Sequence, residues 1–185
     1  MNSILDKTIQ KASWKKAILF GALFAVLYTV VNFSDIGVAG LLKITGGPNI
    51  LDFETGYTYE EASGMLAALG PEGRAFYQTR IAPLDYPFPF SYMLFYSGLI
   101  AVTIKQAALR NPWKYLLFVP VLAMLCDWTE NIGIAAMLLN YPDLPPWAVS
   151  LSSAFGTLKM VFVVASLVAI GVLSVIFLYS RRRKK

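Results

Sequence analysis

The sequence predicts an all-α integral membrane protein, a bundle of four transmembrane helices. Hydrophobic residues make up 57% of its 185 residues and the mean hydropathy is +0.57, which is more apolar than an ordinary soluble domain. Four runs are long enough to cross a bilayer core, which takes roughly 20 residues: residues 17–39, 88–108, 115–140 and 149–179. We expect residues 1–185 to form one multi-pass domain in a cell membrane, either plasma or inner.

Basic residues are concentrated on one side of this four-helix arrangement. Twelve of the 16 Lys and Arg residues precede the first run, lie at the end of the second or before the third, or follow the fourth. The opposite side is mainly acidic. Because positively charged loops stay in the cytoplasm, we expect both termini to be cytoplasmic. The net charge of +5 is then explained by topology and anionic headgroups, and we expect no nucleic-acid partner.

Residue counts exclude several classes of enzyme. The chain has no histidine, which argues against zinc hydrolases, histidine-ligated haem and a Ser-His-Asp triad. The single Cys126 offers no C-x-x-C redox pair. We expect no cofactor and no metal, so any acid–base chemistry must use carboxylates, Tyr or Lys.

Residues 40–86 form the one substantial segment outside the predicted spans. Thr58 and Glu61 are spaced as a capping box at the start of a helix, and a second short helix is expected from Pro71, after Gly70. We therefore predict a helical extracytoplasmic loop between spans 1 and 2. It either forms a lid over the bundle or simply packs down on it, and we favour packing.

The second span follows a proline-rich entry, residues 85–90. Proline disfavours helix in the residue before it, so we expect this helix to start near Pro87 or Pro89. Asp85 would then cap its amino end. The alternative is that Asp85 lines a pocket.

The third span carries three polar residues, Asp127, Glu130 and Asn131, in its apolar interior. The i, i+3, i+4 spacing places all three on one helical face. Ionisable groups in hydrocarbon cost about 2.5 to 3.5 kcal/mol on insertion scales, so they persist where they pair or have a function. Helical rise places Lys159 of the fourth span at the depth of Glu130, and we predict an ion pair with Glu130 or Asp127.

One lysine does not balance these acids. Asp127 and Glu130 face a single cation, with Asp35 of the first span as a further acid nearby. Burial and like charge both oppose ionisation, so we expect at least one acid to hold a proton at neutral pH. Such a group is a candidate proton donor.

Three short elements carry a resemblance: Asp85-Tyr86-Pro87, Asp127-x-x-Glu130-Asn131 and Thr157-x-Lys159. They resemble elements of small four-helix bacterial membrane proteins of unassigned function, over roughly residues 58–160. The layout of four spans with a helical loop is also similar to the EXPERA family of sterol isomerases and the sigma-2 receptor. That layout implies acidic residues in a membrane-embedded cavity. The isomerases pair their carboxylates with histidine, so the resemblance does not imply isomerase activity here.

These observations favour a membrane protein whose polar cavity opens toward the outer leaflet and binds a membrane lipid or another lipophilic small molecule. Asp127 and Glu130 are the candidate acid/base pair if the protein also acts on its ligand. The expected ligand-binding residues are Asp85, Tyr96, Asn131, Thr157, Lys159, Asn32 and Asp35. Two alternatives stay open: ion or proton transport through the same residues, and a non-catalytic subunit whose buried ion pair only specifies packing. The sequence does not decide between enzyme, transporter and subunit, and it leaves the oligomeric state open.

Overall fold

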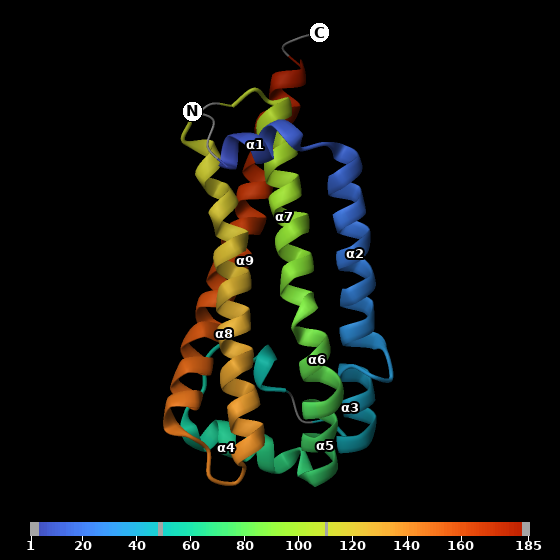
Figure 1. Cartoon of the computed structure of the whole chain (residues 1–185), viewed down its shortest axis with the longest axis vertical. Coiled ribbons are helices and arrows are strands. Elements are labelled where there is room, and N and C mark those ends of the chain that lie inside the picture. Colours follow the sequence, from blue (N-terminus) through green and yellow to red (C-terminus); the bar gives the residue numbers. More distant parts are fainter. Residues whose placement is uncertain (1–3, 48–49, 110, 183–185) are drawn as a thin grey trace.

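The computed structural model describes residues 4–47, 50–109 and 111–182, and every regular element in these ranges is helical. Four long apolar helical segments could span a membrane: Trp14–Thr45, Gly70–Gln106, Trp113–Asn140 and Pro146–Arg182. Their main helices are α2 (Trp14–Phe33), α7 (Pro87–Gln106), α8 (Phe118–Asn140) and α9 (Pro146–Arg182). Helix α8 packs along α9, and α2 packs along α7, which also contacts α8 and α9 (Figure 1). The prediction of four apolar helices is confirmed.

The first apolar segment is broken, whereas the sequence predicted one helix over residues 17–39. Helix α2 ends at Phe33, and α3 (Val38–Thr45) follows after a turn. The Ser34 hydroxyl donates to the Val30 carbonyl at 2.5 Å, a local bond that competes with the helical ladder. Gly37 then lies so close to the Val31 carbonyl that a Cβ atom would collide with it. A polar turn and a glycine therefore redirect the chain inside the apolar run.

The second long segment starts earlier than predicted. Helices α5 (Gly70–Phe76), α6 (Ala82–Asp85) and α7 are joined through a π-helical turn, η2 (Tyr77–Ile81). Pro87 does begin α7, but Tyr86 keeps a helical backbone, with φ −72° and ψ −49°. The preference against helix before proline is thus overridden, and the helical path runs from Gly70 to Gln106.

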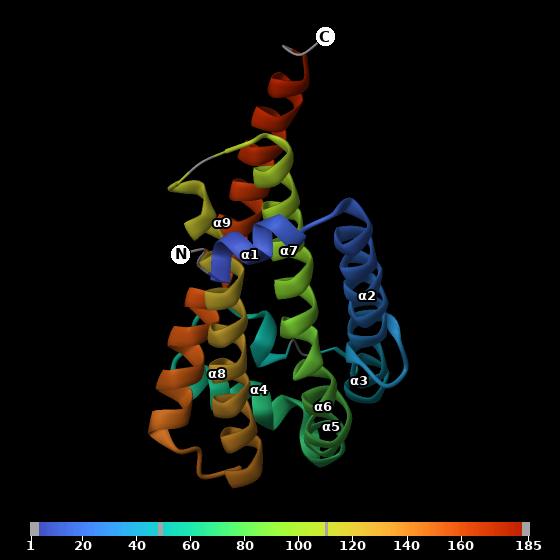
Figure 2. The same ribbon diagram turned by 45° about the horizontal axis from the view of Figure 1, so that its top comes forward.

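Residues 50–81 close one end of the bundle by packing onto α8 and α9. This part contains η1 (Leu51–Phe53), α4 (Tyr59–Ala68) and α5, and it lies at the end away from both termini (Figure 2). Leu51, Leu66 and Tyr77 are buried in one core with Ile134 and Met137 of α8. Burial of these side chains holds the segment against the helices.

The predicted capping box at the start of α4 is present. The Thr58 side chain accepts from the Glu61 N–H at 3.2 Å, and the Glu61 carboxylate accepts from the Thr58 N–H at 2.7 Å. The backbone hydrogen bond from Thr58 lowers the pKa of the Glu61 carboxyl group. The N–H groups of Thr58 and Glu61, which have no partner within the helix, are both satisfied by side chains, and this explains why the helix begins here.

The opposite end of the bundle carries α1 (Ile4–Lys11) and η3 (Trp113–Leu117). Leu5 and Ile9 of α1 pack against a core that includes Ile104 and Leu117. Lys114 forms an ion pair with Asp6 at 3.2 Å. The short α1 therefore lies across the end of α7 beside the start of α2 (Figure 1).

Candidate functional site

The polar face predicted for the third span exists and points into the protein. Asp127, Glu130 and Asn131 are all buried on α8, and Glu130 has an exposed fraction of 0%. The Asn131 amide donates to Asp127 Oδ1 at 3.1 Å. The Tyr92 hydroxyl of α7 donates to Asp127 Oδ2 at 3.1 Å. Both oxygens of Asp127 thus have a neutral donor.

Lys159 of α9 supplies the cation, as predicted. Its Nζ lies 2.7 Å from Glu130 Oε2, which confirms the pairing with Glu130 and not with Asp127. The same Nζ lies 2.8 Å from Asp52 Oδ1 and donates to the Asp52 carbonyl at 3.3 Å. A buried ammonium with two carboxylates satisfies the requirement that a desolvated charge be paired.

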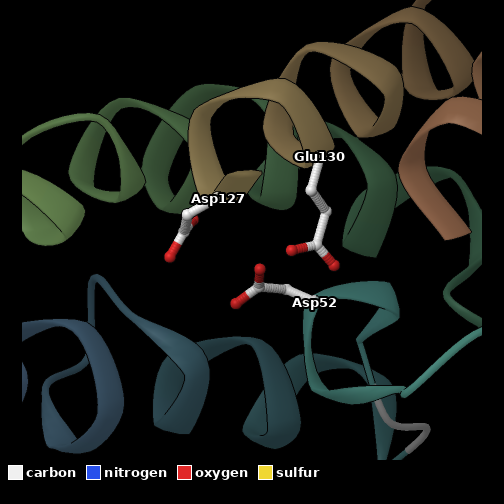
Figure 3. A group of neighbouring side chains, drawn as sticks. All are labelled: Asp52, Asp127 and Glu130. Carbon is white, nitrogen blue, oxygen red and sulfur yellow. The ribbon is translucent and has the colours of Figure 1, made fainter. Parts of the chain in front are cut away.

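Asp52 is the residue that the sequence reasoning missed. It comes from η1, more than 70 residues before Glu130, and its carboxylate reaches the same point in space (Figure 3). Carboxylate oxygens of Asp52, Asp127 and Glu130 lie within 4.8 Å of one another. One signal was present: Asp52 interrupts an apolar stretch whose neighbours Ile50 and Leu51 are buried. We call these three acids and Lys159 the carboxylate–lysine cluster.

The three carboxylates have the composition of a cation site, but an ammonium already takes the cation's place. Lys159 contacts Asp52 and Glu130 directly, and Asp127 accepts from two neutral donors. A hard metal ion would need these oxygens as ligands. It could enter only if Lys159 moved away, so the present geometry suits an ion-pair network better than a metal centre.

Small residues on α9 make room for the Glu130 carboxylate. A Cβ atom on Gly156 would lie 2.5 Å from Glu130 Oε1. The Ser152 hydroxyl donates to the Glu130 carbonyl at 3.0 Å. Gly156 was not singled out from the sequence, although it precedes Lys159 by three residues and therefore shares its helical face.

Tyr57, just before α4, closes the cluster from the end segment. Its N–H donates to the Ser153 hydroxyl at 2.8 Å. Burial raises the pKa of the Tyr57 hydroxyl well above its usual range, and the charges of Glu130 and Asp52 add to this. Tyr57 is therefore a neutral hydroxyl near the acids.

A cavity of about 470 Å³ adjoins the cluster. Asp52, Asp127 and Lys159 form part of its wall, and most of the remainder is apolar or aromatic: Phe24, Tyr28, Val31, Phe53, Phe88, Tyr92, Tyr96, Met160 and Val163. We call it the aromatic pocket. The rings of Phe24 and Phe88 stack at 5.8 Å, and Tyr92 and Tyr96 lie 5.7 Å apart. The volume and lining are typical of small-molecule sites.

The predicted ligand-binding residues fall into three groups: those that line the aromatic pocket, one behind its wall and two away from it. Asp85, Asn32, Tyr96 and Lys159 line the aromatic pocket. Asp85 is buried and lines this pocket, whereas the N-cap residue of α7 is Tyr86, which makes no side-chain cap hydrogen bond, so the structure places Asp85 in the pocket wall and not at the expected cap. Asn131 lies behind the wall, where it positions Asp127.

Asp35 and Thr157 are not brought to the cluster. Asp35 pairs with Lys43 at 2.6 Å in an exposed position, because the turn after α2 carries it away from the bundle. Thr157 is exposed on α9, and its hydroxyl donates to the Ser153 carbonyl at 3.0 Å. The depth argument placed both near the site, but depth along a helix does not determine which face a side chain occupies.

Comparison with known proteins adds no relative: no family model, curated protein or solved structure matches this chain. Function must therefore be inferred from the site itself.

Proposed function

We propose that this chain is a four-span membrane protein, with both termini in the cytoplasm, whose aromatic pocket binds a lipid-like small molecule. One observation carries the proposal: a 470 Å³ cavity has an aromatic wall and ends at a buried carboxylate–lysine cluster. Such a cavity suits an amphiphile whose apolar part lies along the rings and whose polar group meets the acids. The likeness to small four-helix bacterial membrane proteins remains part of this proposal.

The charges favour a ligand with a cationic or hydrogen-bond-donating head. The wall presents Asp52, Asp85 and Asp127 with the single ammonium of Lys159. A protonated amine would add the missing positive charge, and the rings of Tyr92 and Tyr96 offer cation–π contacts worth about 0.5 to 2 kcal/mol. If chemistry follows binding, Asp127 and Glu130 form the acid/base pair and Lys159 is their counter-ion.

The test uses the purified full chain in mild detergent with two probes of equal chain length, a long-chain tertiary amine and the corresponding alcohol. We expect the amine to raise the melting temperature more than the alcohol does, because a ligand that binds only the folded state stabilises it. The amine effect should be lost in Asp127→Asn and in Glu130→Gln. Asp35→Asn removes an acid outside the pocket and should keep it.

Three results would overturn the proposal. The first is equal stabilisation by amine and alcohol in every variant, which would indicate general partitioning into the detergent micelle. The second is loss of the amine effect in Asp35→Asn to the same extent as in Asp127→Asn. The third is an amine effect that survives all three substitutions, which would place the ligand elsewhere.

Transport through the same residues ranks second. An ion path needs polar groups or water at every depth. Beyond the cluster, the buried hydroxyls of Ser166 and Thr103 donate to carbonyls of their own helices, Phe162 and Leu99. These bonds use the hydroxyl protons locally and supply no continuous polar path, which favours a pocket closed toward the end that carries the termini.

A further inference from the structure

A second cavity, of about 290 Å³, lies at the opposite end of the bundle, where α1 meets α2 and α7. It shares no lining residue with the aromatic pocket. Exposed Lys11 and Lys16 form the part of its lining that we call the mouth, and half-buried Phe20, Leu94 and Gly98 form the part that we call the inner wall. Cationic groups at the mouth and apolar groups inside make it an amphipathic site.

The mouth is held in place by lysines that bind the end of α1. Lys16 Nζ donates to the Lys11 carbonyl at 3.1 Å. Lys105 Nζ of α7 donates to the Gln10 carbonyl at 2.7 Å and to the Ala12 carbonyl at 2.9 Å. Cations here satisfy the last carbonyls of α1. The bond to Lys11 occupies one of the three ammonium protons of Lys16, which leaves donors for a ligand.

No acidic side chain is among the residues that line this mouth in the described part of the chain. The adjacent start of α2 has Ser13 as its cap, which accepts from the Lys16 N–H at 3.3 Å, and its first turn contains no acid. The amino end of α2 therefore adds positive potential to that of the two lysines, while Lys16 and Lys105 satisfy the opposing carbonyl end of α1. The mouth is electrostatically complementary to an anion.

The inner wall provides an apolar track that continues from the mouth. From Leu94 to Ala101 it follows α7 over about 10 Å, at 1.5 Å per residue. A Cβ atom on Gly98 would lie in ordinary contact with the Phe20 ring, at 3.4 Å, so a side chain larger than that of alanine would take up space in the track. The Ser97 hydroxyl oxygen is buried beside the track and has no hydrogen-bond partner among the described residues. A soluble anion would leave this track and hydroxyl unused.

We propose that this cavity binds an anionic phospholipid, with the phosphate at Lys11 and Lys16 and an acyl chain along Phe20, Leu94 and Gly98. The charge selects the headgroup, and the track selects a lipid over free phosphate. Ser97 is placed to donate to an ester carbonyl. The site is separate from the aromatic pocket, so the two proposals stand or fall independently.

The experiment measures the melting temperature of the full chain in mild detergent during titration with dioctanoyl phosphatidylglycerol, dioctanoyl phosphatidylcholine or inorganic phosphate. The test variant is Lys11→Gln/Lys16→Gln. Its matched control, Lys7→Gln/Lys15→Gln, removes the same charge from the same two helices at residues that do not line the cavity. Gly98→Leu fills the track and leaves every lysine in place.

We expect phosphatidylglycerol alone to stabilise the wild-type chain and the control. Its apparent affinity should fall about 25-fold in Lys11→Gln/Lys16→Gln, since each lysine near an anionic headgroup contributes about fivefold. Gly98→Leu should also weaken it, and this variant decides the matter if the double variant does not fold.

Four results would overturn the proposal. Equal weakening in the control and test variants would mean that surface charge alone attracts the lipid. If phosphatidylcholine raised the melting temperature as much as phosphatidylglycerol does, the lysines would have no role in selecting the headgroup. Inorganic phosphate binding as well as the lipid, or Gly98→Leu leaving lipid affinity unchanged, would reassign the site to a soluble anion.

Discussion

Lys159→Met is the substitution whose consequence the structure defines best. Lys159 Nζ lies 2.7 Å from Glu130 and 2.8 Å from Asp52, and each contact is worth about 6 kcal/mol in Coulomb energy at an effective dielectric of about 20. Desolvation of the partners offsets most of this. Removing one partner of a buried pair costs about 3 to 5 kcal/mol, because the remaining charge is stranded. We expect a loss in this range.

Second substitutions separate the two partners. Glu130 has an exposed side-chain fraction of 0% and Asp52 of 17%, so water can reach a stranded Asp52 more easily than a stranded Glu130. Lys159→Met/Glu130→Gln should therefore recover more stability than Lys159→Met/Asp52→Asn. The coupling energies of the Lys159–Glu130 and Lys159–Asp52 pairs should fall within about 0.5 to 3 kcal/mol. The Lys159–Glu130 value should be the larger of the two.

The assay is reversible unfolding in mixed detergent, followed by circular dichroism, for the single and double variants of each cycle. Lys43→Met serves as the control, since its pair with Asp35 is exposed and should contribute little to stability. Additive losses in both cycles would show that Lys159 does not pair with either acid. A loss in Lys43→Met as large as in Lys159→Met would refute the reasoning from burial.

Three further predictions follow from the same structure. In a cysteine-free background, Glu60→Cys should react with an impermeant thiol reagent from outside the cell and Asn111→Cys should not, since basic residues keep the loop that contains Asn111 in the cytoplasm. The reverse labelling pattern would show that the topology is inverted. Gly156→Ala should cost about 1 to 3 kcal/mol of stability, because its Cβ would lie 2.5 Å from Glu130 Oε1. Gly171→Ala, with nothing within 4 Å of its Cβ, should be neutral or stabilising, and equal losses would contradict the packing argument. Liposomes containing the protein should show no proton or cation flux above empty vesicles, whereas flux abolished by Glu130→Gln would place transport first.

The apolar helices and the burial of the acids on the third span could be predicted because they follow from local pattern. The length of an apolar run decides whether it can cross a bilayer, and helical periodicity alone puts Asp127, Glu130 and Asn131 on one face. A pairing of Lys159 with Glu130 or Asp127 also followed, because unpaired charge in hydrocarbon is too costly. The capping box at Thr58 is equally local.

Contacts between distant segments were decided by the tertiary structure alone. Asp52 reaches Lys159 because the apolar residues beside it are buried against α8, and no periodicity in the sequence links positions 107 residues apart. Asp35 shows the converse: its depth was predicted, but the turn after Phe33 points it toward Lys43 and away from the cluster.

The helix through residues 70–106 was misjudged for a related reason. Local preference places a boundary before Pro87, yet packing of Tyr77 and Ile81 in the core keeps the segment helical through it. By itself the sequence determined which residues must be hidden from lipid, since that depends on transfer free energy and helical period. Which of them meet, and the pocket they enclose, depended on side-chain packing between segments, and this is encoded only in the folded chain.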